Sequence, residues 1–296
     1  VVPPAPPERH VQNHPDVPSA SARTLCIALY IGGKTVPDKT AVTHSEGDGH
    51  DHSADAPQKI DFKTILAAAQ KDITPNQAQR LTALENSVTR GDVKEQQIHA
   101  FHEMARFWLD SARKFELYAY YTSEAAKLEN SEKSLTFAAR LFLDRLMMSG
   151  DPAMQTWLAS NAKVLLENAL KINPANDSSR IGLGSCYLFG NISSNPMEGI
   201  TMIRQVVEKN PENIYGQMML ALGGKKSGQY DKAIERFLLI VQKEPDNIEA
   251  IFHIAECYDL KGDKTNAIVF YEKAKDLVKI PQAKEELNNR IMELKK

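Results

Sequence analysis

QMMLALGGKKSGQYDKAIERFLLIVQKEPDN, residues 217–247, returns in altered form as AIFHIAECYDLKGDKTNAIVFYEKAKDL, residues 250–277. The two segments align at a constant offset of 34 residues, so that Ala221 matches Ala255 and Gly228 matches Gly262. Further pairs match at the same offset: Leu220 with Ile254, Ala233 with Ala267, Ile234 with Ile268, Phe237 with Tyr271, and Ile240 with Ala274. Repetition at a fixed interval of this size indicates stacked copies of one supersecondary unit.

A third copy precedes these two, in residues 177–213. It carries a three-residue insertion in the turn 190–196. Its matching residues are Leu183, Gly184, Tyr187, Gly199, Ile203, Val206 and Pro211. Three consecutive segments of the chain therefore share one plan.

Small residues recur where two antiparallel helices of one unit would touch. They are Gly184, Ala221 and Ala255 on the first helix, and Gly199, Ala233 and Ala267 on the second. Larger side chains at these positions would wedge the two helices apart. Gly228 and Gly262 suit the tight turn between the helices, and Pro211 and Pro245 end the second helices. The pattern predicts pairs of closely packed helices.

The repeated residues resemble the tetratricopeptide repeat family over residues 177–277. Upstream, two stripes resemble the first helices of degenerate units: Phe101, Met104, Ala105 and Trp108, and then Leu135, Phe137, Ala138 and Leu141. The resemblance implies an all-α fold, a right-handed superhelical solenoid of antiparallel helix pairs. It implies about five units, in residues 98–130, 131–176, 177–213, 214–247 and 248–281. Capping helices are expected in residues 61–97 and 282–296.

Capping residues predict where several helices begin. Asp61 is a suitable N-cap for a short helix that ends at Gln70, and Thr74 precedes Pro75 at the start of a second helix that ends near residue 91. The pair Asp151–Pro152 predicts the start of a further helix, which runs to Ile172.

The resemblance also implies a binding face, formed by the first helix of each unit. Carried over residue by residue, the family's positions fall on Ile181, Ser185 and Leu188, then Tyr215, Met218, Leu222, Lys225 and Lys226, and then Phe252, Glu256 and Asp259. Such a face would hold a peptide or a helix of an unidentified protein partner. The Lys, Arg and Asn set with which chaperone-binding members clamp a terminal carboxylate is missing. In an alternative interpretation, these side chains simply pack between neighbouring first helices.

The composition argues against several other functions. With 36 basic and 38 acidic residues, the formal net charge of -2 gives no long-range field that would attract nucleic acid. The three cysteines lie far apart and form no CxxC pair: Cys26, Cys186 and Cys257. Residues 223–227, GGKKS, lack the upstream glycine and the preceding strand of a phosphate-binding loop. We therefore predict a protein that is not an enzyme and that needs no cofactor.

Residues 1–60 are predicted to be largely disordered, because they are rich in proline and polar residues. One apolar tract, residues 25–31, could be the h-region of a signal peptide or the end of a membrane anchor, although a spanning helix needs roughly 20 residues. Together with Gly33–Pro37 and His50–His52, this region resembles uncharacterised bacterial envelope proteins that carry such repeats. The resemblance implies a location in the bacterial cell envelope, periplasmic or anchored in the inner membrane. A cytoplasmic location stays open.

Residues 43–57 form a linker rich in histidine and acidic residues. Its candidate metal ligands are His44, His50 and His52, among Glu46, Asp48 and Asp51. Imidazole and carboxylate groups at such short spacing could converge on a zinc, nickel or copper ion. Metal binding or buffering by this linker, with the repeats as a structural mount, is the alternative function. In the other interpretation the linker is solvated and binds metal only adventitiously, since it offers no surrounding groups to orient the ligands.

Overall fold

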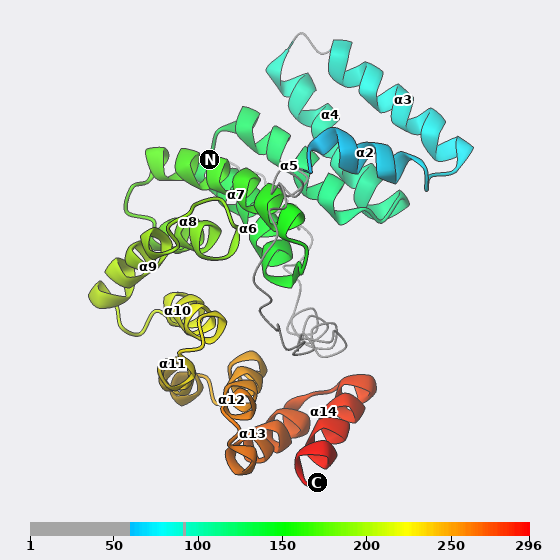
Figure 1. Ribbon diagram of the computed structural model, residues 1–296. Coiled ribbons are helices and arrows are strands. Elements are labelled where there is room, and N and C mark those ends of the chain that lie inside the picture. Colours follow the sequence, from blue (N-terminus) through cyan, green and yellow to red (C-terminus); the bar gives the residue numbers. More distant parts are fainter. Residues whose placement is uncertain (1–59, 91–92) are drawn as a thin grey trace, which may run out of the picture. The chain divides into compact units, whose positions relative to one another are not determined.

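The computed structural model describes residues 60–90 and 93–296. All regular structure in these residues is helical, as Figure 1 shows. The chain divides into two compact units, one with the described residues 60–245 and one with the described residues 246–296. The predicted all-α fold is therefore confirmed for the described part of the chain. The segment predicted to be disordered, with its apolar tract and its histidine linker, lies in residues 1–59, outside the described residues.

The larger unit is a succession of antiparallel helices. They are α2 (Phe62–Gln70), α3 (Pro75–Arg90), α4 (Lys94–Arg106), η1 (Phe107–Ser111), α5 (Phe115–Glu129), α6 (Glu132–Met148), α7 (Pro152–Ile172), α8 (Asp177–Phe189), α9 (Met197–Lys209), α10 (Ile214–Lys226) and α11 (Tyr230–Lys243). The most extensive packing joins α4 to α5, α6 to α7, α8 to α9, and α10 to α11. These pairs lie within the predicted units; the division of the whole chain into five units stays a prediction.

The N-terminal part of the larger unit shows both a confirmed cap and an unexpected helix type. Asp61 accepts a hydrogen bond from the backbone N–H of Thr64 at 2.8 Å, and α2 ends at Gln70 as predicted. The ring of Phe62 in α2 stacks on Tyr120 of α5 at 3.7 Å between centroids. The sequence did not predict η1, a π-helix that continues α4 and buries Trp108 completely.

The helices α8 and α9 touch through their backbones. A Cβ atom added to Gly184 would lie 2.7 Å from the carbonyl oxygen of Gly199, and one added to Gly199 would lie 2.2 Å from the carbonyl oxygen of Gly184. Side-chain carbon cannot occupy this gap, so both glycines are required at the crossing. In the α10–α11 pair, Ala221 and Ala233 are fully buried. The small residues predicted at the helix contacts therefore serve this purpose.

Turns between helices use two local devices. Gly228 and Gly262 have positive φ values of 75° and 79°, a conformation that glycine adopts without strain. An asparagine precedes α8, α10 and α12, and its side chain accepts a hydrogen bond from a backbone N–H in the first turn. These N-caps are Asn176, Asn213 and Asn247. They fix the start of each first helix.

The C-terminal unit consists of α12 (Ile248–Leu260), α13 (Lys264–Leu277) and α14 (Pro281–Leu294). α12 packs on α13, with Ala255 and Ala267 fully buried, and α13 packs on α14. α14 contributes the buried side chains Leu287 and Ile291 to this contact. Across the described residues of both units, no helix combines the length and the apolar character that crossing a bilayer requires.

Candidate functional site

In the larger unit, the first helices of three successive pairs lie next to one another. α6 contacts α8, and α8 contacts α10. These contacts are more extensive than any between successive second helices such as α7 and α9. Across these three pairs, the first helices therefore pack closer together than the second helices do.

Tyr215 of α10 is influenced by residues of the other two first helices. Ser185 of α8 and the charges of Asp144 and Arg140 of α6 act on the pKa of its hydroxyl. Burial is the main cause that raises the pKa of Tyr215 to about 12, so the hydroxyl stays protonated at neutral pH. Residues of all three first helices thus influence this hydroxyl.

Phe137 of α6 is an exposed aromatic residue, with 52% of its surface accessible. It lies one helical turn before Arg140 and Leu141, on the same side of α6. Arg140 and Asp144 form an exposed ion pair at 3.6 Å. We define the α6–α10 face as Phe137, Arg140 and Asp144 of α6, Ser185 of α8 and Tyr215 of α10.

The predicted binding residues of α8 and α10 are mostly packed against other helices. Ile181, Ser185, Leu188 and Met218 are buried, whereas Leu222 and Lys225 are half-buried. Their packing agrees with the alternative interpretation for the buried positions. The partner-binding role of Tyr215, Met218, Leu222 and Lys225 stays a prediction.

Lys226 folds back onto the end of α8. Its Nζ atom donates a hydrogen bond to the carbonyl oxygen of Leu188 at 3.4 Å and lies 5.6 Å from the centre of the Phe189 ring. Burial lowers the pKa of the Lys226 ammonium group. This lysine therefore has partners within its own chain.

In the C-terminal unit, the three predicted residues of α12 differ in exposure. Phe252 is buried and packs near Tyr271, with 5.9 Å between ring centroids. Glu256 is half-buried, and its Oε2 atom lies 2.7 Å from Nδ1 of His253. Two of these three side chains, Glu256 and Asp259, therefore lie in polar contacts within the unit.

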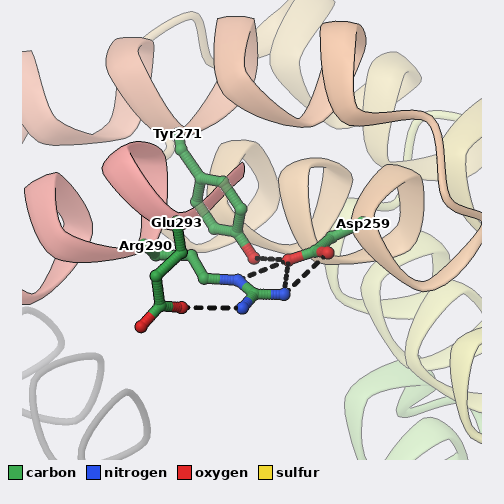
Figure 2. Close-up of polar contacts among 4 residues, drawn as sticks. All are labelled: Asp259, Tyr271, Arg290 and Glu293. Carbon is green, nitrogen blue, oxygen red and sulfur yellow. Dashed lines mark hydrogen bonds and ion pairs between the residues drawn. The ribbon is translucent and has the colours of Figure 1, made fainter. Parts of the chain in front are cut away.

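Asp259 is held by a network that sequence reasoning did not find. Figure 2 shows Arg290 of α14 directed at the Asp259 carboxylate, with Nε and Nη2 each donating a hydrogen bond at 2.8 Å. The hydroxyl of Tyr271 donates to the same carboxylate at 3.2 Å, and Glu293 accepts from the other side of the guanidinium group at 3.0 Å. The negative charge of Asp259 is thus compensated by Arg290, which ties α14 to α12.

The predicted metal ligands His44, His50 and His52 lie outside the described residues. Within residues 60–90 and 93–296, no group of three or more His, Cys, Asp or Glu side chains is arranged to hold a metal ion. Cys186 is fully buried, and burial is the main cause that raises the pKa of its thiol to about 12.

Comparison with known proteins gives one family. Residues 248–277, which form α12 and α13, match the tetratricopeptide repeat family. Human Superkiller complex protein 3 is 27% identical over 99 residues, which are 33% of this chain and 6% of that protein. The chain thus spans only a small part of that relative's length.

Solved structures show a similar fold. A tetratricopeptide repeat protein from Parabacteroides merdae superposes with a TM-score of 0.52 at 13% identity, over 79% of this chain and 86% of that chain. YrrB, described as a TPR protein with an unusual peptide-binding site, gives a TM-score of 0.40 at 15% identity, over 70% of this chain and 98% of that chain. At 13% identity, the likeness to the Parabacteroides merdae protein concerns the fold alone.

Proposed function

We propose that this chain, which is a tetratricopeptide repeat protein, is a non-catalytic scaffold that holds a peptide or a helix of a protein partner on the α6–α10 face. Stacked helical repeats commonly bind other proteins on a concave surface made by their first helices. The observation that carries the proposal is the exposure of Phe137 on that side of the larger unit.

The chemistry of the face suits a partner with an apolar anchor. Phe137 offers a large exposed ring, and aromatic side chains are frequent among the residues that dominate the energy of protein interfaces. Arg140 and Asp144 lie one and two turns away, with side chains 55% and 64% exposed. Exposed ion pairs of this kind contribute little to stability, so both charges can reorient toward a partner. We expect an apolar side chain of the partner to contact Phe137.

The absence of a catalytic role is part of the same proposal. A nucleophile needs a neighbouring base or a lowered pKa. The thiol of Cys186 has the opposite property, because burial holds its pKa far above neutrality. This property supports a structural role for Cys186.

Substitution of Phe137 tests the proposed face. The variant Phe137→Ala removes the exposed ring, and the matched control Val164→Ala shortens a side chain that is 44% exposed on α7, the second helix of the same pair. Both variants should fold, which circular dichroism verifies. Crosslinking and pull-down from the native cell should then recover a partner with the wild type and with Val164→Ala, and lose it with Phe137→Ala. Equal capture by Phe137→Ala would place the binding surface elsewhere.

Metal binding by the histidine linker remains the second proposal, and it rests on the spacing of His44, His50 and His52. Calorimetric titration of the full chain with zinc, nickel and copper tests it against a variant in which all three histidines are alanine. The proposal requires the wild type to bind one of these ions more tightly than a generic histidine peptide does. Equal heats for the wild type and the variant would end it.

A location in the bacterial envelope is likewise a proposal, which rests on the apolar residues 25–31 and the similar N-terminal segment of envelope proteins. Fractionation of the native cell tests it. Recovery of the chain with the cytoplasmic fraction alone would contradict it.

A further inference from the structure

α2 is the least extensively packed helix of the larger unit. It has nine residues, and an isolated helix shorter than about 12–15 residues is marginal in water. Its contact with α5 is less extensive than the contact of any other described helix with its best-packed neighbour. Only Ala69 of its nine residues is buried. The helical state of α2 therefore depends on its contact with the rest of the unit, and few interactions hold it there.

α2 lies on a set of aromatic side chains. Phe62 stacks on Tyr120 of α5, with 3.7 Å between ring centroids, and meets Tyr121 edge to face at 5.7 Å. Phe101 of α4 stacks on Tyr121 at 6.3 Å. We define the aromatic surface as Phe101, Tyr120 and Tyr121. Phe101 and Tyr120 are only partly buried even with α2 in place, so removal of α2 would expose more of this surface.

The side chains that α2 directs toward the core recur with helical spacing. Phe62, Ile65, Leu66 and Ala69 stand at positions i, i+3, i+4 and i+7, and all four belong to or pack against one hydrophobic cluster. The residues between them are exposed. This is the spacing of the anchors with which an amphipathic helix binds an apolar surface of another protein. α2 therefore shows which chemistry the aromatic surface accepts.

We propose that the aromatic surface is a docking site for an amphipathic helix of a protein partner, and that α2 is its displaceable occupant within the chain. The partner helix presents an aromatic side chain, followed by aliphatic side chains three and four residues later, as α2 does. α2 must leave before that helix binds, so the chain inhibits its own binding at this site. The aromatic surface shares no residue with the α6–α10 face, so either proposal can fail without the other.

Binding of a peptide to the full chain tests the site. The probe is a fluorescent synthetic peptide of residues 60–72, which carries the anchors of α2, and fluorescence anisotropy measures its dissociation constant. Two variants of the chain weaken α2 in different ways. Phe62→Ala removes the aromatic anchor, and Asp61→Ala removes the exposed N-cap that accepts a hydrogen bond from the backbone N–H of Thr64. Lys63→Ala changes an exposed residue of the same helix and is the matched control.

The peptide competes with α2 for one surface, so its apparent affinity rises with the fraction of chains in which α2 has left. We expect Phe62→Ala to tighten peptide binding by roughly tenfold or more relative to the wild type. Asp61→Ala should tighten it by roughly fivefold, and Lys63→Ala should leave it unchanged. A peptide that itself carries Phe62→Ala should bind none of these chains.

The proposal is overturned if the peptide binds none of the chains, or if Phe62→Ala and Asp61→Ala bind it no more tightly than Lys63→Ala does. Either result would show that α2 is a fixed part of the core. Circular dichroism verifies the fold of each variant, and Asp61→Ala keeps the test decisive if Phe62→Ala does not fold, because it changes only an exposed side chain. A wild-type dimer in sedimentation that Phe62→Ala abolishes would also overturn the proposal, since the occupant would then be α2 of a second copy.

Discussion

Replacement of Gly199 by alanine should destabilise the larger unit through the contact between α8 and α9. The added Cβ atom would lie 2.2 Å from the carbonyl oxygen of Gly184 and 3.0 Å from Cβ of Tyr187. Non-bonded carbon atoms prefer separations of about 3.5–4.0 Å. The obstructing oxygen belongs to the backbone, so relief requires the two helices to move apart by about 1 Å.

Two opposing effects set the magnitude. Overpacking of this kind costs about 1–3 kcal/mol, and alanine is about 1 kcal/mol more favourable than glycine within a helix. A backbone atom can move aside less than a flexible side chain, so we expect an overpacking cost in the upper half of this range. The net loss of unfolding free energy for Gly199→Ala should therefore be about 1–2 kcal/mol. Gly224→Ala in α10 is the matched control, because its nearest neighbour would be Cβ of Ala233 at 3.5 Å. This control should gain about 0.5–1 kcal/mol.

Urea unfolding followed by circular dichroism measures both variants. The midpoint should fall for Gly199→Ala and rise for Gly224→Ala, with the slope of the transition unchanged. A midpoint for Gly199→Ala at or above that of the wild type would refute the backbone contact. Equal losses in both variants would show that glycine itself, and not the space around it, is responsible.

Three further changes test other parts of the structure. Asp259→Asn should lower the unfolding free energy of the C-terminal unit by about 1–2 kcal/mol, and its thermal midpoint with it. Arg290→Lys should destabilise the unit less, because lysine keeps the charge but cannot form the paired hydrogen bonds. Equal thermal midpoints for both variants and the wild type would contradict this prediction. Asn213→Ala removes an N-cap and should lower the unfolding free energy, measured with a chemical denaturant, by about 1 kcal/mol. Asn213→Asp keeps a capping oxygen and should lower it much less. The prediction fails if both variants lose the same free energy. Burial raises the pKa of Cys186 from 9.0 to about 12, so its contribution to stability is complete below pH 9 and is lost as the pH rises from 9 toward 12. Peptide mass spectrometry after alkylation at pH 9 should find Cys186 unmodified in the native chain and modified in urea.

The fold could be predicted largely from local signals. Asp61 and Asp151 cap the helices that they were expected to cap, because a short side chain directly before a helix has one main hydrogen-bonding use. Gly228 and Gly262 take the positive φ values that their place in the turns required. The π-helix η1 could not be predicted, since its residues read as the continuation of an ordinary amphipathic helix.

Less of the candidate site than of the fold could be predicted from the sequence. The sequence places Phe137 in an apolar stripe of a degenerate unit, where it precedes Ala138 as Leu220 precedes Ala221. Leu220 is 8% exposed and Phe137 is 52% exposed. The contact between Asp259 and Arg290 joins residues 31 positions apart, and no local pattern indicates which helix faces which.

Phe137 and Leu220 differ in exposure although they occupy matching positions, and the lengths of their helix pairs differ too. α6 and α7 have 17 and 21 residues, whereas α10 and α11 have 13 and 14. In the longer pair, an apolar residue at a position that is packed in α10 is exposed in α6. The regular positions of the repeat are occupied by packing, as the burial of Ile181, Leu188 and Met218 shows. Phe137 departs from this packing, and the proposed partner-binding face therefore depends on this residue.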